Sequence, residues 1–532
     1  MNNEELLDVS ISDLTVDLEE RLSILKNNLA LLNQFSSKLN LLKIQLLQKS
    51  YKDVDRNIKF LKEKYSESLT IYKQFHKTIE GRNNKLFLIN SLRNKKRELS
   101  EFIRTHQSIL GSLLTSADWQ SPSYSYSIYP LSGTQEGKIL GTINDYKRDV
   151  HLDEEDFENN FVKEYVDRRA DQKIQALLTN SGMAAFTTIL NFLLSEKKTE
   201  GTILIGKSVY FQYKQIISKS FYRSVIEISE VDTDRLIKTI FTRKPKVVYI
   251  DSLSNSIDIP VPDLKWIFES VVKSYKEEIY FIIDNTCLSK TCQPYKLIPH
   301  HCNNLHLIIF ESLMKYVHLG LDKITAGIIL SKGQDSSKIF EYRKHSGTNI
   351  LDSSVYVIPR PNRLILSKRL DRFQRNAFFL ATSLQEFVDN NENCPLKKII
   401  YPGLSNHPSY PWSRKMSFQG SFVNLLFREE FDSISQHKKF IDQAIKEAKK
   451  RNVELVAGTS FGLDITRIYL TSLWTDFGRP FIRIAVGTED MMMMGEIAHV
   501  IISTLSHFRS IVPSSVLRTI NRTKKRTGLK YL

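Results

Sequence analysis

An aspartate and a lysine each follow a strand-like apolar run. Asp284 ends "EIYFIID", and Lys315 lies in "FESLMKYVHLG", directly after "LHLIIF". An ammonium among apolar residues is costly unless it is paired or acts as a neutral nucleophile. The two side chains therefore suit either a buried ion pair or a site in which the lysine amine attacks a carbonyl carbon.

A third strand-like run, "IQALLT", is followed by "NSGMAAFTTILNFLL", in which a glycine-containing turn opens a helix. Backbone N–H groups at such a helix start favour an anion such as phosphate. Many strand-to-helix turns contain glycine, so this signal alone is weak. Combined with the acid and the lysine, it also fits the fixed points of pyridoxal phosphate, for which lysine forms the Schiff base and the carboxylate keeps the ring nitrogen protonated.

Short apolar runs alternate with helical patterns through this part of the chain. The candidate strands are "IQALLT", "GTILIG", "KVVYID", "EIYFIID", "LHLIIF" and "AGIIL". Such alternation predicts an α/β fold with a mostly parallel sheet and helices on both faces. Ligands of such sheets bind beyond the carboxyl ends of the strands, where the acid, the lysine and the turn are expected.

The first 115 residues have a helical period instead. Apolar residues at three- and four-residue steps predict amphipathic helices, as in a bundle or coiled coil; they include Leu18, Leu22, Leu25, Leu29, Leu32, Ile58, Leu61, Leu88, Leu92, Leu99 and Ile103. The helices can pack on one another or serve as a docking or oligomerisation module. We expect the rest of the chain to fold without them.

The composition limits the compartment and the partners. Four cysteines in 532 residues favour a reducing compartment, and "HHCNN" lacks zinc-type pairing, so we expect no metal. The acidic start is no secretory signal and no long apolar run spans a membrane, so we predict a cytoplasmic protein. The net charge of +16 is scattered except in the basic tail, so a nucleic-acid partner is not favoured.

Several motifs, taken in order, resemble the Cys/Met-metabolism (trans-sulfuration) family of fold type I pyridoxal-phosphate enzymes, which includes cystathionine synthases and lyases and methionine γ-lyase. They are "NSGMAAF", "IIDNTCLSK", "SLMKY", "YPGLSNHP" and "FIRIAVGTED", and the likeness runs from about residue 140 to about 505. "SKRLDRFQRNAFFLATSLQEF" is similar to the family's interdomain helix. The opening helices have no counterpart in the family.

The resemblance implies a cofactor site. Lys315 would carry the aldimine and later move protons between substrate carbons, Asp284 would face the pyridine nitrogen, and Tyr210 would stack on the ring as a second catalytic residue. Phosphate would be bound by Gly182, Met183 and Ser312, and Asn255 would lie near the phenolic oxygen.

It also implies a substrate site and a shared active site. Arg483 in "FIRIAVG" would clamp the substrate carboxylate through a bidentate hydrogen bond, with Ser460 nearby. Tyr146 and Arg148 are similar to a Tyr-x-Arg pair that reaches the phosphate of a neighbouring subunit, which implies a homodimer or homotetramer.

Some positions depart from the family pattern and leave the substrate open. Met314 replaces a threonine before the lysine, Asp251 replaces a glutamate, and Ser256 replaces the proline of an Asn-Pro pair; the glycines that normally follow Tyr210 are missing. The segment between "TSFGLDITRIYL" and "FIRIAVG" is shorter than in family members. Loops of this kind usually set specificity.

The sequence therefore predicts a helical extension (1–115), a linker (116–133), a large α/β cofactor domain (134–365), a smaller α+β C-terminal domain (366–510) and a basic tail (511–532). The expected activity is β/γ-elimination or γ-replacement on an amino acid. Two alternatives remain open at this stage: a non-catalytic scaffold with the helices as its interaction module, and an aminotransferase on the same fold.

Overall fold

The computed structural model describes residues 3–42, 48–75, 82–116, 147–169, 172–221, 223–299, 302, 304–471 and 478–508. Residue contacts divide the chain into two compact units. Unit 1 contains Met1–Ser256, Pro260–Asp371 and Lys415–Phe418, and unit 2 contains the remaining residues. Tyr146, most of the predicted linker, the basic tail and the two histidines of "HHCNN" lie outside the described residues.

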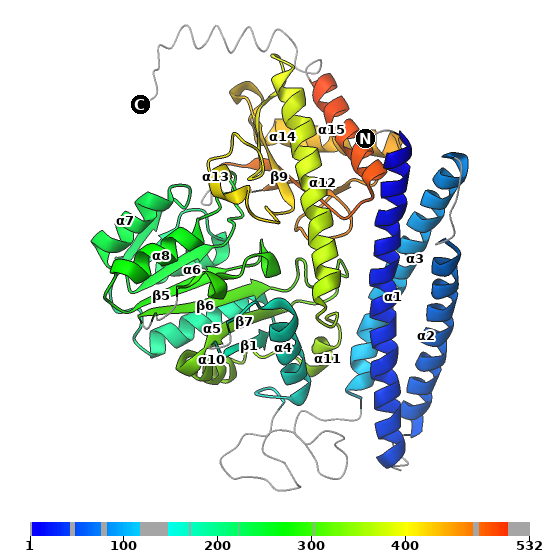
Figure 1. The fold of residues 1–532 in the computed structure, drawn as a ribbon, viewed down its shortest axis with the longest axis horizontal. Coiled ribbons are helices and arrows are strands. Elements are labelled where there is room, and N and C mark those ends of the chain that lie inside the picture. Colours follow the sequence, from blue (N-terminus) through cyan, green and yellow to red (C-terminus); the bar gives the residue numbers. More distant parts are fainter. Residues whose placement is uncertain are drawn as a thin grey trace. The chain divides into compact units, whose positions relative to one another are not determined.

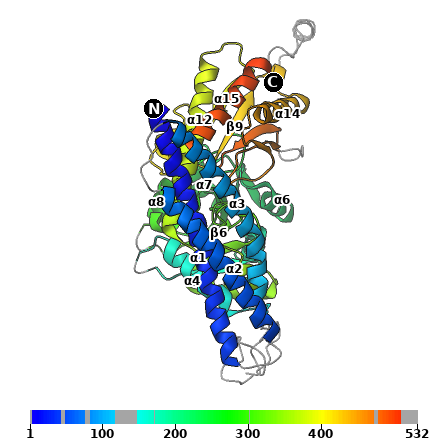
Figure 2. The ribbon, with the colours of Figure 1, turned by 90° about the vertical axis from the view of Figure 1, so that its right-hand side faces the viewer.

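Three long helices open unit 1: α1 (Asn3–Leu42), α2 (Gln48–Phe75) and α3 (Arg82–Leu114). They lie side by side in Figure 2. Most of the predicted apolar stripe is buried between them; the residues that are less than a tenth exposed include Leu18, Leu22, Leu25, Leu32, Ile58, Leu61, Leu88, Leu92, Leu99 and Ile103. The predicted amphipathic helices are therefore present, and they bury their apolar faces within unit 1.

A seven-stranded sheet forms the centre of unit 1 (Figure 1). Its strands are β1 (Ile174–Thr179), β2 (Ile203–Gly206), β3 (Val225–Ile228), β4 (Val247–Asp251), β5 (Ile279–Asp284), β6 (Leu305–Ser312) and β7 (Gly327–Lys332), in the spatial order β1-β7-β6-β5-β4-β2-β3. Neighbours from β6 through β5, β4 and β2 to β3 are parallel, and β7 is antiparallel to both β1 and β6. The expected α/β class with a mostly parallel sheet is confirmed.

Helices connect and cover these strands: α4 (Leu152–Tyr165), α5 (Gly182–Ser195), α6 (Phe211–Ser220), α7 (Thr233–Arg243), α8 (Leu264–Ser274), α9 (Pro294–Leu297), α10 (Gly333–His345) and α11 (Asp352–Val355), with a 3-10 turn at Ser289–Thr291. Side-chain caps fix several helix starts: Ser181, Asp232 and Asp263 each accept a hydrogen bond from a backbone N–H of the following turn. These caps satisfy donors that a helix start leaves unpaired.

Unit 2 contains a second sheet with helices against it. The strands are β8 (Leu396–Ile400), β9 (Phe422–Phe427), β10 (Val456–Ala457), β11 (Arg467–Thr471) and β12 (Phe481–Ala485), in the order β10-β11-β12-β9-β8. The helices are most of α12 (Arg363–Asp389), α13 (Tyr410–Ser413), α14 (Ile434–Lys450) and α15 (Met491–Phe508), with a 3-10 turn at Glu429–Phe431. Apolar residues of α12, α14, α15 and the strands form one core, as expected of a smaller α+β domain.

The opening helices belong to the same compact unit as the large sheet. The Gln107 side chain of α3 donates a hydrogen bond to the Tyr356 carbonyl oxygen over 2.9 Å, and a Cβ placed on Gly111 would clash with the Ser353 backbone. Such close packing counts against the expectation that the α/β body folds unchanged without residues 1–115. The domain boundaries remain a prediction.

No helix in the described parts of the chain is both long enough and apolar enough to cross a membrane.

Candidate active site

The residues of unit 1 that were predicted to take part in the chemistry lie at or just after the ends of neighbouring strands, at one edge of the sheet. Asp251 and Asp284 end β4 and β5 and are paired in register, and Asp284 is paired with Phe310 of β6, two positions before Ser312. Because β4, β5 and β6 are parallel, their carboxyl ends meet at the same edge. The expected gathering of these residues beyond the strands is therefore present in the fold.

The start of α5 forms an anion cradle beside this edge. Ser181 caps the helix, accepting the Ala184 N–H through Oγ over 3.0 Å and the Ala185 N–H through its carbonyl oxygen over 3.0 Å. Among the described residues, the N–H groups of Gly182 and Met183 have no hydrogen-bond acceptor. Two open N–H groups at the positive end of a helix dipole suit a phosphate.

Small residues allow three chain segments to meet at the cradle. A Cβ added to Gly182 would lie 2.8 Å from the Ser312 Cβ, and one added to Gly327 would clash with the Ser181 backbone. The Ser312 N–H donates to Thr286 Oγ1 over 2.9 Å, which ties the end of β6 to the turn after Asp284. Glycine at positions 182 and 327 therefore allows Ser312 and the start of β7 to lie directly against the helix start.

Lys315 lies in the turn that follows β6 and is half-buried. Its charge is close enough to Asp284 to lower the pKa of that carboxyl, but burial has the larger, opposite effect. Burial raises the pKa of Asp284 to about 6, although hydrogen bonds from Thr286 also oppose the rise. A cationic group facing Asp284 would hold the carboxylate ionised.

A second buried acid, Asp251, supports the neighbouring helix. Its Oδ2 accepts the Tyr210 N–H over 3.1 Å, and its Oδ1 accepts a hydrogen bond from the Tyr213 hydroxyl. Burial, followed by the nearby charge of Asp284, raises the pKa of Asp251. From the sequence, Asp251 was predicted only as a departure from the family pattern, and Tyr213 was not predicted to belong to the site. The sequence signal for Tyr213 is the second tyrosine of "VYFQY" at the start of α6.

Tyr210 and Asn255 border the same strand ends. Burial and the charge of Asp284 raise the pKa of Tyr210, whose hydroxyl donates to Gln212 Oε1 over 3.0 Å. Asn255 follows β4, and its Oδ1 is buried with no hydrogen-bond partner among the described residues. The assigned roles of Tyr210 and Asn255 remain predictions.

Arg148 is two-thirds exposed and donates from Nε to Asp149 over 2.9 Å. The Lys147 side chain between it and Tyr146 is buried and paired with Asp352 over 2.8 Å. Tyr146 itself lies outside the described residues, so the expected Tyr-x-Arg contact with a neighbouring subunit stays a prediction.

The two predicted substrate-binding residues belong to unit 2. Arg483 lies on β12, is 1% exposed, and donates from Nε to Asn424 Oδ1 over 2.9 Å. Its guanidinium carbon lies 4.3 Å from the centre of the Phe422 ring. Ser460 is a half-buried loop residue with a positive φ of 76°. Stacking and the Asn424 contact fix the Arg483 guanidinium, and its role as a carboxylate clamp stays a prediction.

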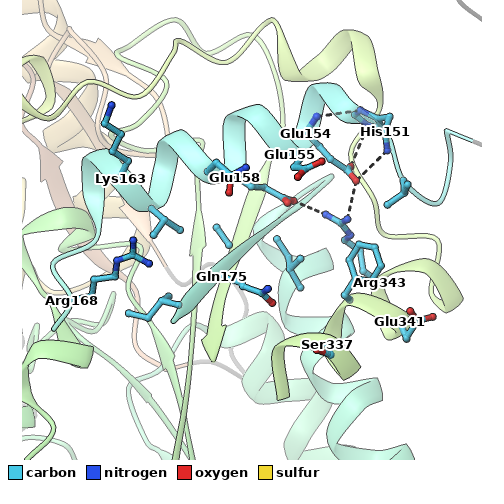
Figure 3. Close-up of a pocket in the computed structure, with 17 residues that line it drawn as sticks. His151, Glu154, Glu155, Glu158, Lys163, Arg168, Gln175, Ser337, Glu341 and Arg343 are labelled. Carbon is cyan, nitrogen blue, oxygen red and sulfur yellow. Dashed lines mark hydrogen bonds and ion pairs between the residues drawn. The ribbon is translucent and has the colours of Figure 1, made fainter. Parts of the chain in front are cut away.

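A cavity of about 690 Å³ lies on another part of unit 1, among α4, β1 and α10 (Figure 3). Arg343 donates to Glu154 Oε1 over 2.9 Å and to Glu158 Oε1 over 2.7 Å, and burial raises the pKa of Glu158 to about 8. None of the predicted site residues lines this cavity. These two ion pairs of Arg343 join α10 to α4.

The fold and the strand-end residues together define a class. A mostly parallel seven-stranded sheet, an anion cradle after β1, a buried aspartate ending β5 and a lysine after β6 are the arrangement of fold type I pyridoxal-phosphate enzymes. Solved structures agree: cystathionine γ-synthase from Xanthomonas oryzae pv. oryzae, in complex with cystathionine, has a TM-score of 0.57 at 16% identity, covering 76% of this chain and 99% of that one. Cystathionine γ-lyase from Lactobacillus plantarum has a TM-score of 0.56 at 16% identity, and the match covers 76% of this chain and 99% of that one.

The chain belongs to the Cys/Met metabolism PLP-dependent enzyme family, whose sequence profile matches residues 120–452. It is 24% identical over 386 residues to the bifunctional enzyme flvA of Aspergillus flavus, covering 72% of this chain and 45% of that protein. It is also 24% identical over 260 residues to L-methionine γ-lyase of Fusobacterium nucleatum, and that match covers 48% of this chain and 60% of the lyase. The chain thus spans about half the length of the curated relatives that it matches. The suspected family is confirmed.

The residues at the strand ends fit the family's cofactor, pyridoxal 5′-phosphate. The open N–H groups of Gly182 and Met183 match a phosphate, and Asp284, whose burial disfavours its charge, matches a protonated ring nitrogen. Asn255, which follows β4, adds a buried oxygen that has no hydrogen-bond partner among the described residues. Lys315 provides the amine that a Schiff base requires.

Proposed function

We propose that the protein catalyses β/γ-elimination or γ-replacement on a sulfur- or oxygen-substituted amino acid. The observation that carries the proposal is the convergence of Lys315, Asp284 and the α5 cradle at one edge of the sheet. When bound, the cofactor ring withdraws electrons from the substrate α-carbon. Asp284 keeps that ring cationic, and the cradle holds its phosphate.

The Lys315 Nζ would accept the α-proton and deliver protons to other substrate carbons, since Lys315 follows β6 at the edge where the cofactor would bind. Tyr210 would stack on the ring and orient it, and Ser312 would add a hydroxyl to the phosphate site. Arg483 binds the substrate carboxylate, with Ser460 beside it. The fixed guanidinium of Arg483, stacked on Phe422, supports this role because a bidentate clamp works best when its geometry is already set.

The protein acts as a homo-oligomer in the cytoplasm, in which Tyr146 and Arg148 reach the phosphate of a neighbouring subunit. The exposure of the Arg148 side chain supports this arrangement. Equilibrium sedimentation of the purified protein tests it, and a monomer with full activity would contradict it.

A product assay distinguishes the reactions. Elimination releases ammonia and a 2-oxo acid from cystathionine, methionine or an O-acylated homoserine, whereas replacement consumes an added thiol without ammonia release. An absolute requirement for a 2-oxo acid as amino acceptor would instead indicate transamination and overturn the proposal.

A further inference from the structure

The segment that follows Lys315 has an unusual backbone. Leu319, Gly320 and Asp322 have positive φ values of 51°, 77° and 51°. Turn hydrogen bonds hold it, from Leu319 N–H to the Tyr316 carbonyl and from Leu321 N–H to the His318 carbonyl, each 3.0 Å long. Left-handed backbone at Leu319 and Asp322 is unfavourable for residues with side chains, so surrounding contacts must maintain it.

Two arginines of the opening helices supply such contacts. Arg21 of α1 donates from Nη1 to the Leu319 carbonyl oxygen over 2.9 Å. Arg104 of α3 donates from Nη2 to the Gly320 carbonyl oxygen over 3.0 Å and from Nε to the Leu321 carbonyl oxygen over 3.2 Å. Three successive carbonyl groups are therefore bound by guanidinium groups from two helices.

Buried charges fix the position of Arg21. Its side chain is 1% exposed, its Nε donates to Ser100 Oγ of α3 over 3.0 Å, and its Nη1 pairs with Glu20 over 2.7 Å. Glu20 also pairs with the buried Arg369 at the start of α12 over 3.2 Å. Buried charges are tolerated only when they are paired and hydrogen-bonded, so this network specifies one docking position of α1.

Both arginines precede residues 120–452, the stretch that matches the family. Hydrogen bonds from ionised donors are stronger than those between neutral groups. The turn is continuous from Lys315 to Gly320, so restraining its end also restrains the lysine.

We propose that the opening helices position the catalytic lysine: Arg21 and Arg104 are positioning residues that fix the 316–322 turn and, through it, the Lys315 amine. The role assigned to the amine rests on the proposed function, whereas the restraint on the turn does not. The helical region is thus a working part of the active site.

Arg104→Met is the test variant, because Arg104 is partly exposed and its loss should be tolerated by the fold. Lys95→Met is the matched control. Lys95 lies on the same helix, is more deeply buried, and pairs with Glu67 over 2.8 Å and Glu98 over 3.0 Å, within the bundle. Arg104→Lys keeps one cationic donor and should recover part of any loss.

Hydrogen–deuterium exchange on the full chain without added cofactor measures the turn directly. We expect peptides covering 316–322 to exchange about ten- to hundredfold faster in Arg104→Met, since two hydrogen bonds from a charged donor are lost. Exchange there should be unchanged in Lys95→Met. Equal exchange in wild type and Arg104→Met would overturn the proposal. Variants of Arg21 test the same restraint: we expect peptides covering 316–322 to exchange more slowly in Arg21→Lys than in Arg21→Met.

The cofactor-loaded protein gives an independent readout. In Arg104→Met we expect the pH titration of the cofactor absorbance to shift and kcat to fall about ten- to hundredfold with little change in KM, as for a misplaced catalytic group. A rise in KM alone, or the same change in Lys95→Met, would contradict positioning. If wild-type protein binds no cofactor, the proposed function fails, and the exchange experiment still decides the restraint.

Discussion

Asp251 and Asp284 are paired in register at the carboxyl ends of two neighbouring parallel strands, and both are buried. The carboxylate of Asp251 is occupied by the Tyr213 hydroxyl and the Tyr210 N–H. Asp284 accepts hydrogen bonds from its own turn, at Thr286, and faces the charge of Lys315. Asp251 thus holds the start of α6, whereas Asp284 is the acid that we propose for the cofactor ring.

Asp284→Asn should weaken cofactor binding. The amide keeps the shape of the side chain and an oxygen for the Thr286 N–H, but it cannot stabilise a protonated ring nitrogen. Loss of a charge-assisted hydrogen bond should increase the dissociation constant of the cofactor about tenfold to hundredfold. Titration of cofactor-free protein with pyridoxal phosphate measures this constant, and an unchanged value would contradict the role of Asp284.

The same variant should stabilise the cofactor-free protein at alkaline pH. The folded-state pKa of Asp284, about 6, lies above the ordinary value of 3.8, so its favourable contribution is complete below about pH 4 and is lost as pH rises through 6. That loss amounts to about 3 kcal/mol at most. Urea unfolding should therefore show Asp284→Asn to be the more stable protein at pH 8, with the difference vanishing near pH 4.

Tyr213→Phe should destabilise unit 1, because it leaves a buried oxygen of Asp251 without its hydroxyl donor. The expected cost is about 1–3 kcal/mol in the free energy of unfolding. Tyr249→Phe is the control: the Tyr249 hydroxyl is buried with no partner among the described residues, so its removal should be neutral or stabilising. Thermal unfolding of both variants checks the prediction, and equal effects would argue against the Asp251 network.

Gly182→Ala should disturb the anion cradle. The new methyl group would lie 2.8 Å from the Ser312 Cβ, so the helix start or the end of β6 must shift. We expect cofactor affinity to fall about tenfold and stability to fall by about 1–3 kcal/mol, as in overpacked sites. In α15, no described side chain lies within 4 Å of a Cβ added to Gly495, so Gly495→Ala should instead raise the free energy of unfolding by up to about 1 kcal/mol. Equal cofactor affinity and equal stability of the two variants would contradict the role of Gly182 in the anion cradle.

Arg483→Lys should raise KM for the amino-acid substrate about tenfold to hundredfold while leaving the cofactor spectrum unchanged. Lysine keeps the charge but cannot form the two parallel hydrogen bonds of a guanidinium. Arg467→Lys on the adjacent strand β11 is the control, since Arg467 is partly exposed and donates to the Thr459 carbonyl oxygen over 2.8 Å. A normal KM in Arg483→Lys would refute the clamp.

Apolar runs long enough to be buried on both sides revealed six of the seven strands of the large sheet. The exception, β3, is a four-residue edge strand with mostly half-buried or exposed residues, so it lacks the continuous apolar signal. The part of the candidate site that lies at strand ends could be predicted from the sequence, because Asp284, Ser312 and Lys315 each follow an apolar run.

The contacts of Arg21 and Arg104 were not predictable in the same way. A helical period shows which face of α1 or α3 is buried, but it does not show what a buried arginine on that face will meet. Leu319 lies 298 positions from Arg21. Only the folded chain brings a charged group of one helix to the carbonyl groups of a turn so distant in sequence.

The central claim is that Lys315 forms the covalent link to pyridoxal phosphate. Purified, cofactor-loaded protein should absorb at about 410–430 nm, as expected of a Schiff-base-linked cofactor, and borohydride should abolish that band. Mass spectrometry of the reduced, digested protein should then find the cofactor on the peptide that contains Lys315, and Lys315→Ala should bind cofactor without being labelled. A label on another lysine, or none in loaded protein, would contradict the account.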